Sequence, residues 1–187
     1  MKRAVFLDRD GTLIEEVGYV GRLEQVVCYP WTADVIRAFN RAGLSVVVIT
    51  NQSGIARGYL TEAAVETVHR HFTDVMAEGG ARIDAYYYCP HHPDGTVEAY
   101  ALRCQCRKPA PGLIERAARE LKIDPSRSFV VGDKWLDIGL ARTVGARGIL
   151  VRTGYGASQE SQPHPDFVAD VIVDNLAAAA SWILQHL

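Results

Sequence analysis

The sequence predicts an α/β fold, a Rossmann-like three-layer sandwich with a central parallel sheet and helices on both faces. Short apolar, β-branched segments alternate with amphipathic helical segments along the whole chain. Such alternation implies right-handed crossovers and parallel strands. The length of 187 residues is typical of one domain, so we expect a single domain over residues 1–187.

Composition and charge exclude several classes of protein. The chain is 48% hydrophobic and 22% charged, which favours a packed core over disorder. The net charge of -2 lends no electrostatic support to a nucleic-acid or membrane partner. The basic start, Met1-Lys2-Arg3, is followed by too short an apolar run for a signal peptide, and no run approaches a membrane span. We expect a cytoplasmic protein and, without an evident apolar stripe, a monomer.

The first half of the chain predicts three strands and two helices. Apolar, β-branched runs predict strands over residues 3–7, 44–49 and 83–88. Helical spacing predicts a helix over 32–42 that stops at Gly43. A longer helix is expected from the N-cap Thr61 to about residue 78, before two glycines. Residues 50–54 are polar and predict a turn.

The second half of the chain continues the alternation after an irregular segment over residues 89–107. A helix is expected to begin at Pro111, with apolar residues on one face. The further predicted strands span residues 128–131, 147–151 and 171–173. The further predicted helices span residues 135–144 and 176–187, and residues 154–166 are expected to form a loop.

Polar side chains follow the predicted strands where these strands end. They are Asp8 and Asp10, Thr50, and Asp133 with Asp137, and Lys108 precedes the helix that begins at Pro111. The carboxyl ends of parallel strands share one edge of the sheet, where ligands bind. Carboxylates crowded at this edge would repel one another without a cation, and hard oxygen ligands suit Mg²⁺.

The spacing of the first two aspartates suggests phosphoryl transfer. Asp8 and Asp10 are two residues apart, so their side chains point the same way in an extended segment. One carboxylate can attack phosphorus and form an aspartyl-phosphate, while the other serves the leaving oxygen as an acid. Mg²⁺, Lys108 and the Thr50 hydroxyl would supply charge neutralisation and alignment.

Four motifs in order carry a resemblance to a known family. They are Asp8-Arg9-Asp10-Gly11-Thr12-Leu13, then Thr50, then Lys108, then Gly132-Asp133-Lys134-Trp135-Leu136-Asp137. This set resembles the signature of the haloacid dehalogenase superfamily of phosphatases and covers roughly the first three-quarters of the chain. The chain lacks room for a large inserted cap domain, so it resembles a capless member. The last part matches nothing diagnostic and is assigned to the scaffold.

A narrower resemblance comes from three segments. Residues 50–54, Arg107-Lys108-Pro109 and the cysteine-bearing loop resemble the heptose bisphosphate phosphatase branch of that superfamily. The resemblance implies Mg²⁺-dependent removal of the 7-phosphate of D-glycero-D-manno-heptose 1,7-bisphosphate, in nucleotide-activated heptose biosynthesis that feeds surface polysaccharide such as lipopolysaccharide. A histidinol-phosphate phosphatase is the alternative, and the preferred anomer is left open. A binding module with a degenerate site is a third possibility, against which the intact motifs argue.

The resemblance also implies residue roles. Asp8 would be the nucleophile and Asp10 the general acid and base, while Thr50 and Lys108 would steady the phosphoryl group. Mg²⁺ would be held by Asp8, Asp133 and the Asp10 backbone carbonyl. The implied substrate contacts are Asp8, Arg9, Asp10, Glu16, Val17, Gly18, Tyr19, Thr50, Asn51, Gln52, Ser53, Arg107, Lys108 and Lys134. Asp137 has two equally weighted interpretations, a charge at a helix N-terminus or a hydrogen bond to the metal site.

The four cysteines are expected to be reduced thiols, and three of them crowd into one stretch. Cys89-Pro90-His91 and Cys104-Gln105-Cys106 form a Cys₃His set that suits tetrahedral Zn²⁺. The pairs are spaced more tightly than is usual, but the resembled family carries a structural zinc here and matches His91 rather than His92. Unligated thiols are the alternative. Cys28 is expected to be a buried thiol, and His69 and His71 are expected at the surface or its boundary.

Overall fold

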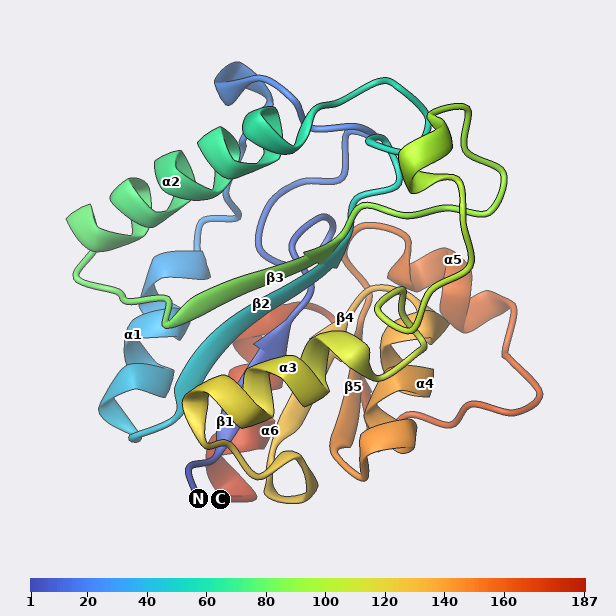
Figure 1. Cartoon of the computed structure of the whole chain (residues 1–187). Coiled ribbons are helices and arrows are strands. Elements are labelled where there is room, and N and C mark those ends of the chain that lie inside the picture. Colours follow the sequence, from blue (N-terminus) through green and yellow to red (C-terminus); the bar gives the residue numbers. More distant parts are fainter.

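Six parallel strands form one sheet in the order β3-β2-β1-β4-β5-β6. The computed structural model describes residues 1–187 (Figure 1). The strands are β1 (Ala4–Leu7), β2 (Ser45–Asn51), β3 (Ala85–Cys89), β4 (Phe129–Gly132), β5 (Arg147–Val151) and β6 (Val171–Val173). The helices are α1 (Thr32–Arg41), α2 (Glu62–Glu78), α3 (Gly112–Leu121), α4 (Trp135–Val144), α5 (Gly156–Ser161) and α6 (Leu176–Gln185). The predicted fold class is confirmed.

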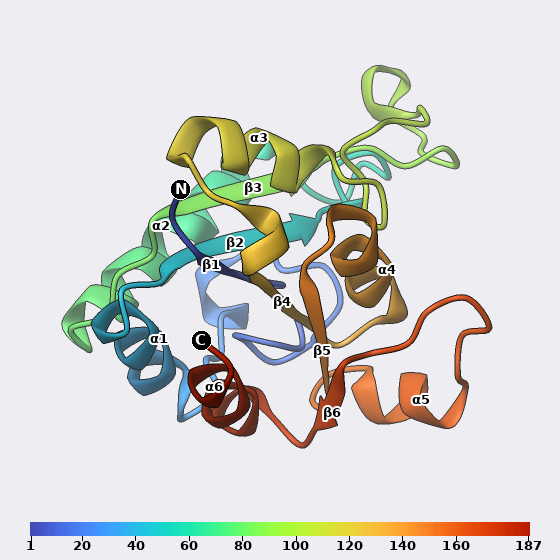
Figure 2. The same ribbon diagram turned by 90° about the horizontal axis from the view of Figure 1, so that it is seen from below.

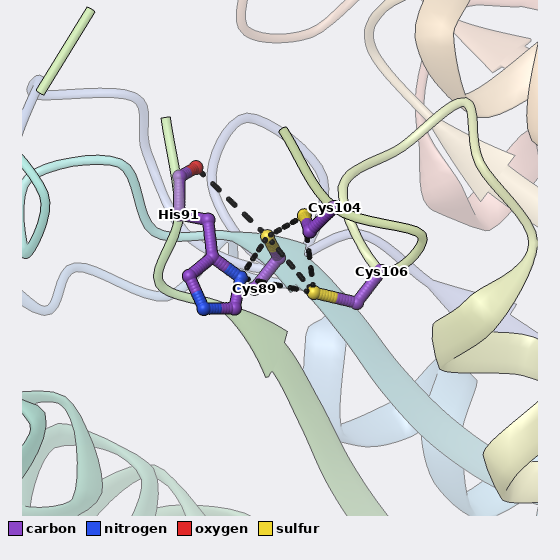
Figure 3. Close-up of side chains that lie close together, drawn as sticks. All are labelled: Cys89, His91, Cys104 and Cys106. Atoms are coloured by element: carbon purple, nitrogen blue, oxygen red, sulfur yellow. Dashed lines mark hydrogen bonds between the residues drawn. The ribbon is translucent and has the colours of Figure 1, made fainter. Parts of the chain in front are cut away.

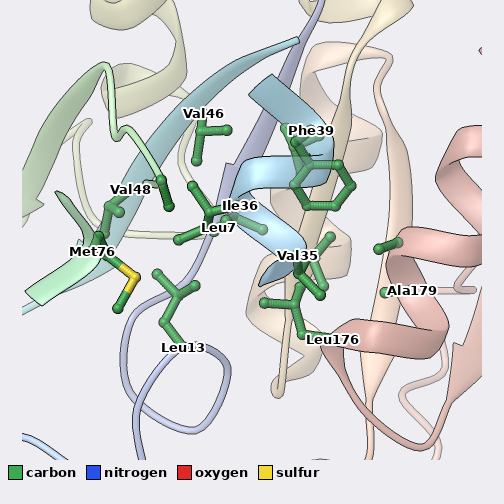
Figure 4. Close-up of a cluster of buried hydrophobic side chains, with 14 of the residues drawn as sticks. Leu7, Leu13, Val35, Ile36, Phe39, Val46, Val48, Met76, Leu176 and Ala179 are labelled. Atoms are coloured by element: carbon green, nitrogen blue, oxygen red, sulfur yellow. The ribbon is translucent and has the colours of Figure 1, made fainter. Parts of the chain in front are cut away.

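Two apolar cores lie on the two faces of this sheet, because successive side chains of a strand point to opposite sides. On β1, Val5 and Leu7 pack with apolar residues of α1, α2 and α6 (Figure 4). Ala4 and Phe6 pack on the other face with residues of α3 and α4. Figure 2 shows α3 and α4 on one side of the strands and α1 and α6 on the other. The sheet is therefore buried on both faces and is a rigid base for whatever its strand ends carry.

The strand order reverses at β1, which fixes where a ligand can bind. The chain runs from β1 to β2 and β3 on one side, and then crosses to β4, β5 and β6 on the other. In register, Leu7 of β1 lies opposite Val48 of β2 and Val131 of β4. Open parallel sheets bind ligands at such a reversal, outside the carboxyl ends of the strands. The residues that follow β1 and β4 meet here.

One helix begins and another ends at a capping residue that the sequence predicts. The Thr61 hydroxyl accepts a hydrogen bond from the Ala64 amide, at 3.1 Å, and starts α2. Gly145 adopts the left-handed conformation at φ 72° and ends α4, at the residue that the sequence indicates. None of the helices is both long and apolar enough to cross a membrane.

Two boundary predictions are wrong. Thr50 and Asn51 are the last residues of β2 rather than part of a turn, because they pair with β3. Within the predicted loop 154–166, residues 156–161 form α5. Gln159 of this helix accepts hydrogen bonds from Trp135, through its backbone oxygen and its side chain. A six-residue helix held by such contacts has no periodic pattern of its own for a sequence to reveal.

Candidate active site

A cavity of about 380 Å³ opens at the carboxyl edge of the sheet. It gathers eleven of the fourteen expected substrate contacts: Asp8, Asp10, Glu16, Gly18, Tyr19, Thr50, Asn51, Gln52, Ser53, Lys108 and Lys134. The structure adds Leu136, Asp137 and Tyr155 to the lining. Residues that are up to 147 positions apart in sequence therefore share one surface, because parallel strands end on the same side.

The buried ammonium group of Lys108 lies between two carboxylates. Its Nζ is 2.9 Å from Asp8 Oδ1 and 2.6 Å from Asp137 Oδ1, and it donates to the Ile49 carbonyl at 3.3 Å. Burial alone would lower the pKa of Lys108, but Asp137 and Asp8 raise it above its ordinary value. Burial would likewise raise the pKa of Asp8, but Lys108 and Lys134 hold it below its usual range. Asp8 is therefore an ionised carboxylate beside a fixed cation.

The end of β2 holds Lys108 in place. The Asn51 side chain donates to the Lys108 carbonyl at 3.3 Å and accepts from the Lys108 amide at 3.0 Å. This pair of hydrogen bonds joins the segment before α3 to the sheet. The position of the lysine thus depends on backbone contacts as well as on the carboxylates that it faces.

Asp133 is a fully buried carboxylate with only one of its two oxygens hydrogen-bonded. Its Oδ2 accepts from the Tyr155 amide at 2.9 Å, whereas its Oδ1 has no hydrogen-bond partner. Gly11 and Gly154 leave room for it, since a Cβ on either would lie 2.2 or 2.3 Å from Asp133 Oδ2. Burial, reinforced by Asp8, raises the pKa of Asp133 to about 7. Lys134 Nζ lies 3.7 Å from Oδ1, an ion pair that is longer than a hydrogen bond. A buried carboxylate oxygen without a hydrogen bond is suited to hold a metal ion.

The donor set at this edge fits Mg²⁺. Carboxylate oxygens of Asp8, Asp133 and Asp137 all lie within 4.8 Å of one another. Oxygen ligands from carboxylates, completed by water and phosphate, are what Mg²⁺ prefers. Of the two interpretations of Asp137 that the sequence leaves open, the structure supports the charge at a helix N-terminus, and it adds a bond to Lys108. Asp137 Oδ2 accepts from the Lys134 amide at the start of α4, and its Oδ1 binds Lys108 beside the cluster.

Asp10 faces the same cavity with both oxygens hydrogen-bonded. Its Oδ1 accepts from Arg9 Nε at 3.1 Å, and its Oδ2 accepts from Arg9 Nη2 at 3.1 Å and from Gln52 Nε2 at 2.9 Å. The Gln52 amide is also 2.9 Å from the Thr50 hydroxyl. Asp10 and Thr50 are thus linked through one side chain, although they come from different strand ends.

Three expected substrate contacts do not line the cavity. The Arg9 side chain is fully buried and binds Asp10, so it does not reach the ligand space. Val17 is 47% exposed and lies outside the lining, because the neighbouring Glu16 and Gly18 face inward instead. Arg107 donates to the His91 carbonyl at 3.3 Å, which keeps its guanidinium against the cysteine loop.

His69 was expected at the surface or its boundary and is instead buried beneath the site. It contacts Arg9 and stacks on Tyr86. A signal existed in the sequence: His69 lies four residues after Val65 and three before Phe72, on the apolar face of α2. The helical spacing therefore indicated a core position, whereas the surface prediction followed the residue type, since histidine is common at surfaces.

The cysteine loop brings its four predicted ligands together (Figure 3). The sulfurs of Cys89, Cys104 and Cys106 are 3.3–3.5 Å apart, and His91 Nδ1 is 3.3 Å from Cys106 Sγ. Zinc–sulfur bonds of about 2.3 Å in a tetrahedron separate sulfurs by about 3.8 Å, which is close to this arrangement. His92 contacts Arg57 instead, at 3.3 Å. The donor atoms therefore fit a closed Cys₃His zinc site.

The remaining cysteine lies apart from this cluster. Cys28 is half-buried rather than fully buried, and it packs against the apolar core on the α1, α2 and α6 face. Burial raises the pKa of its thiol above the ordinary value.

Comparison with known proteins places the chain in a family. A family model described as polynucleotide kinase 3 phosphatase matches residues 3–140, and one described as HAD-hydrolase-like matches residues 105–179. A D-glycero-D-manno-heptose-1,7-bisphosphate 7-phosphatase of Thermosynechococcus vestitus is 44% identical, covering 98% of this chain and 96% of that protein. The chain belongs to the heptose-1,7-bisphosphate 7-phosphatase family of haloacid dehalogenase-like hydrolases.

Other members of the heptose bisphosphate phosphatase family agree in sequence and fold. The Escherichia coli K12 β-anomer phosphatase is 41% identical, over 91% of this chain and 90% of its own. A crystal structure of the D,D-heptose 1,7-bisphosphate phosphatase from B. bronchiseptica, complexed with magnesium and phosphate, has a TM-score of 0.86 and 32% identity. The match covers 100% of both chains, so neither carries a cap domain that the other lacks.

Proposed function

We propose that this protein is a Mg²⁺-dependent phosphatase that hydrolyses the 7-phosphate of D-glycero-D-manno-heptose 1,7-bisphosphate to heptose 1-phosphate and phosphate. The observation that carries the proposal is the contact of Asp8 with the protonated, buried Lys108, in a cavity large enough for a sugar phosphate. Relatives that are 41–44% identical bear the name of this activity. The whole chain serves as a single phosphatase domain, with the C-terminal part as scaffold.

The reaction begins at the ionised carboxylate of Asp8. A carboxylate oxygen attacks phosphorus, the bond from phosphorus to the sugar oxygen breaks, and Asp10 gives a proton to that oxygen. The resulting aspartyl-phosphate is then hydrolysed by a water molecule that passes its proton back to Asp10. Lys108 and the Thr50 hydroxyl steady the phosphoryl oxygens, and Gln52 holds Thr50 and Asp10 in mutual alignment.

Residues at the strand ends would hold the Mg²⁺ ion. The proposed ligands are Asp8, Asp133 and the Asp10 backbone carbonyl. The buried Asp133 Oδ1, which has no hydrogen bond, supports this set. The bound ion would neutralise charge on the phosphoryl group and on the crowded carboxylates. The related crystal structure that holds magnesium with phosphate supports the same pairing of metal and substrate class.

The cysteine cluster is proposed to bind one structural zinc ion through Cys89, His91, Cys104 and Cys106. The segment from 90 to 106 has little secondary structure beyond a short turn of helix at Glu98–Tyr100, so a metal would supply much of its order. Arg107 follows the cluster directly and is bonded to the His91 carbonyl. The zinc would thereby position Arg107 and Lys108, and with them the far end of the substrate.

Steady-state kinetics on three substrates test the proposal. The values of kcat/KM for both anomers of heptose 1,7-bisphosphate should exceed that for histidinol phosphate by about 100-fold or more, since a hydrogen-bonding site rejects a substrate that leaves its polar groups unpaired. Chelation of Mg²⁺ should abolish turnover and its return should restore it. A preference for histidinol phosphate would assign the alternative activity. Absence of phosphate release from every substrate would contradict the assignment as an enzyme.

A further inference from the structure

Arg9 is the largest fully buried side chain of the protein, and the mechanism above gives it no role. Its Nε and Nη2 atoms form two parallel hydrogen bonds with the two oxygens of Asp10. This edge-on pairing fixes the carboxylate in the plane of the guanidinium. Arg9 is attached to the backbone next to Asp10, however, and its long side chain has several rotatable bonds. Something else must hold the far end of the guanidinium.

His69 of α2 occupies that far end. Its Nε2 lies 3.3 Å from Arg9 Nη1, the guanidinium nitrogen that does not contact Asp10. Burial, together with the charge of Arg9, lowers the pKa of His69 to about 3, so the imidazole is neutral. Because a guanidinium can only donate, the contact requires the tautomer in which Nε2 accepts the hydrogen bond and the ring proton lies on Nδ1. Three hydrogen bonds on three nitrogens therefore determine the orientation of the guanidinium plane.

The imidazole ring is itself held rigidly by strand β3. It stacks on Tyr86 with a centroid distance of 4.5 Å and an interplanar angle of 18°, and it meets Tyr88 edge-on at 5.9 Å. The Tyr86 hydroxyl is bonded in turn to Thr73, one turn further along α2. The chain of contacts thus runs from the interface of α2 and β3, through His69 and Arg9, to a carboxylate at the cavity.

We propose that His69 is a positioning residue for catalysis, which acts through Arg9 to hold the Asp10 carboxylate in the orientation required for proton transfer. The inference rests on the proposed function, because it requires Asp10 to be the acid and base. A general acid must meet its target oxygen within hydrogen-bond distance, and a misplacement of about 1 Å can cost about 100-fold in rate. Loss of the Nε2 acceptor would leave Arg9 Nη1 unpaired in a dry interior and free the guanidinium to turn.

Two substitutions of His69 separate positioning from packing. His69→Phe keeps a ring on Tyr86 but removes the acceptor, whereas His69→Gln removes the ring but places an amide oxygen near the position of Nε2. Positioning predicts that His69→Phe lowers kcat by about 10- to 100-fold with KM within about twofold, and that His69→Gln restores kcat to within about threefold of wild type. A packing role predicts the opposite order, with the Phe variant active and the Gln variant impaired.

The measurements are kcat and KM on heptose 1,7-bisphosphate, with thermal unfolding of each variant. His71→Phe is the matched control, because His71 lies on the same helix, is half-buried and has no hydrogen bond to the site. A wild-type kcat in His69→Phe would overturn the inference. A tenfold loss of kcat in a folded His69→Gln variant would also overturn it. The His69→Gln measurement decides the question even if the His69→Phe variant does not fold. Turnover by the wild-type protein, and its loss in Asp10→Asn, separately test the proposed function.

Discussion

The carboxylate edge and the cysteine loop are both built from metal-binding residues, yet they are held in different ways. At the carboxylate edge, Asp8 and Asp133 directly follow β1 and β4, and Asp137 lies in the first turn of α4. All three are buried, and Lys108 compensates part of their charge. In the cysteine loop only Cys89 belongs to a strand, while the other three ligands lie on an irregular segment at the rim of the sheet (Figure 1).

The folded sheet alone therefore positions the side chains of the carboxylate edge, whereas the cysteine loop would need a bound metal to position its ligands. The sheet fixes the carboxylates whether or not a cation is bound, so a metal there would serve chemistry rather than folding. Thiols on a loop without its own core depend on the metal for their arrangement. The two sites are joined at Lys108, which follows Cys106 by two residues and is bonded to Asn51 of β2.

Asp8→Asn tests whether the protein can lose its activity at the carboxylate edge and still fold. We expect kcat to fall by roughly 10⁴-fold or more, because the nucleophile is removed, while the melting temperature changes by only a few degrees. Phosphate release and thermal unfolding measure the two effects, with Asp34→Asn on the exposed side of α1 as the control. Loss of the fold in this variant would show that the carboxylate edge, like the cysteine loop, is needed for folding.

Cys106→Ser tests whether the cysteine loop depends on a metal. The expected results are loss of bound zinc by elemental analysis, faster hydrogen exchange over residues 90–107, and a fall in kcat/KM of about 10- to 100-fold through displacement of Arg107 and Lys108. Cys28→Ser is the matched control and should leave all three unchanged, since Cys28 lies apart from the cluster. Unchanged exchange in a zinc-free Cys106→Ser protein would mean that the loop is ordered by its own contacts.

Glu62→Gln tests how much of the cysteine loop is held without metal. The Glu62 carboxylate accepts hydrogen bonds from the hydroxyls of Tyr100, in the loop, and of Tyr88, in β3. These bonds lower the pKa of Glu62 below its ordinary value of 4.5. Because the folded state binds the proton less tightly than the unfolded state, this stabilisation is present above about pH 4.5 and is lost as the pH falls through the lowered value.

Among the three variants Asp8→Asn, Cys106→Ser and Glu62→Gln, we expect Glu62→Gln to have the smallest effect. The melting temperature should fall by roughly 2–4 °C at pH 7, and the difference from wild type should shrink as the pH falls through the lowered pKa of Glu62. Glu66→Gln, one turn further along α2 and exposed, is the control. A difference that persists unchanged to pH 3 would show that the charge of Glu62 is not what anchors the loop.

Several features could be predicted because they depend on local pattern and on one topological rule. Thr61 and Gly145 bound their helices as expected, because capping is a matter of a few neighbouring residues. The meeting of Asp8 and Thr50 was predicted from the parallel arrangement of the strands, since parallel strands carry their ends to one edge, and Lys108 was placed there by its position before a helix. The Cys₃His cluster followed from residue types suited to one metal.

The sequence by itself thus determined the fold class, the edge at which the polar residues gather and the composition of both candidate metal-binding sets. Only the tertiary structure decided that Arg9 turns away from the cavity, that Asp137 binds Lys108 and the start of α4 together, and that residues 156–161 form a helix. These features depend on partners distant in the chain, such as His69, which lies 60 residues from Arg9. A local pattern records which face of an element is apolar, whereas the partner of a buried polar group is set by packing between elements.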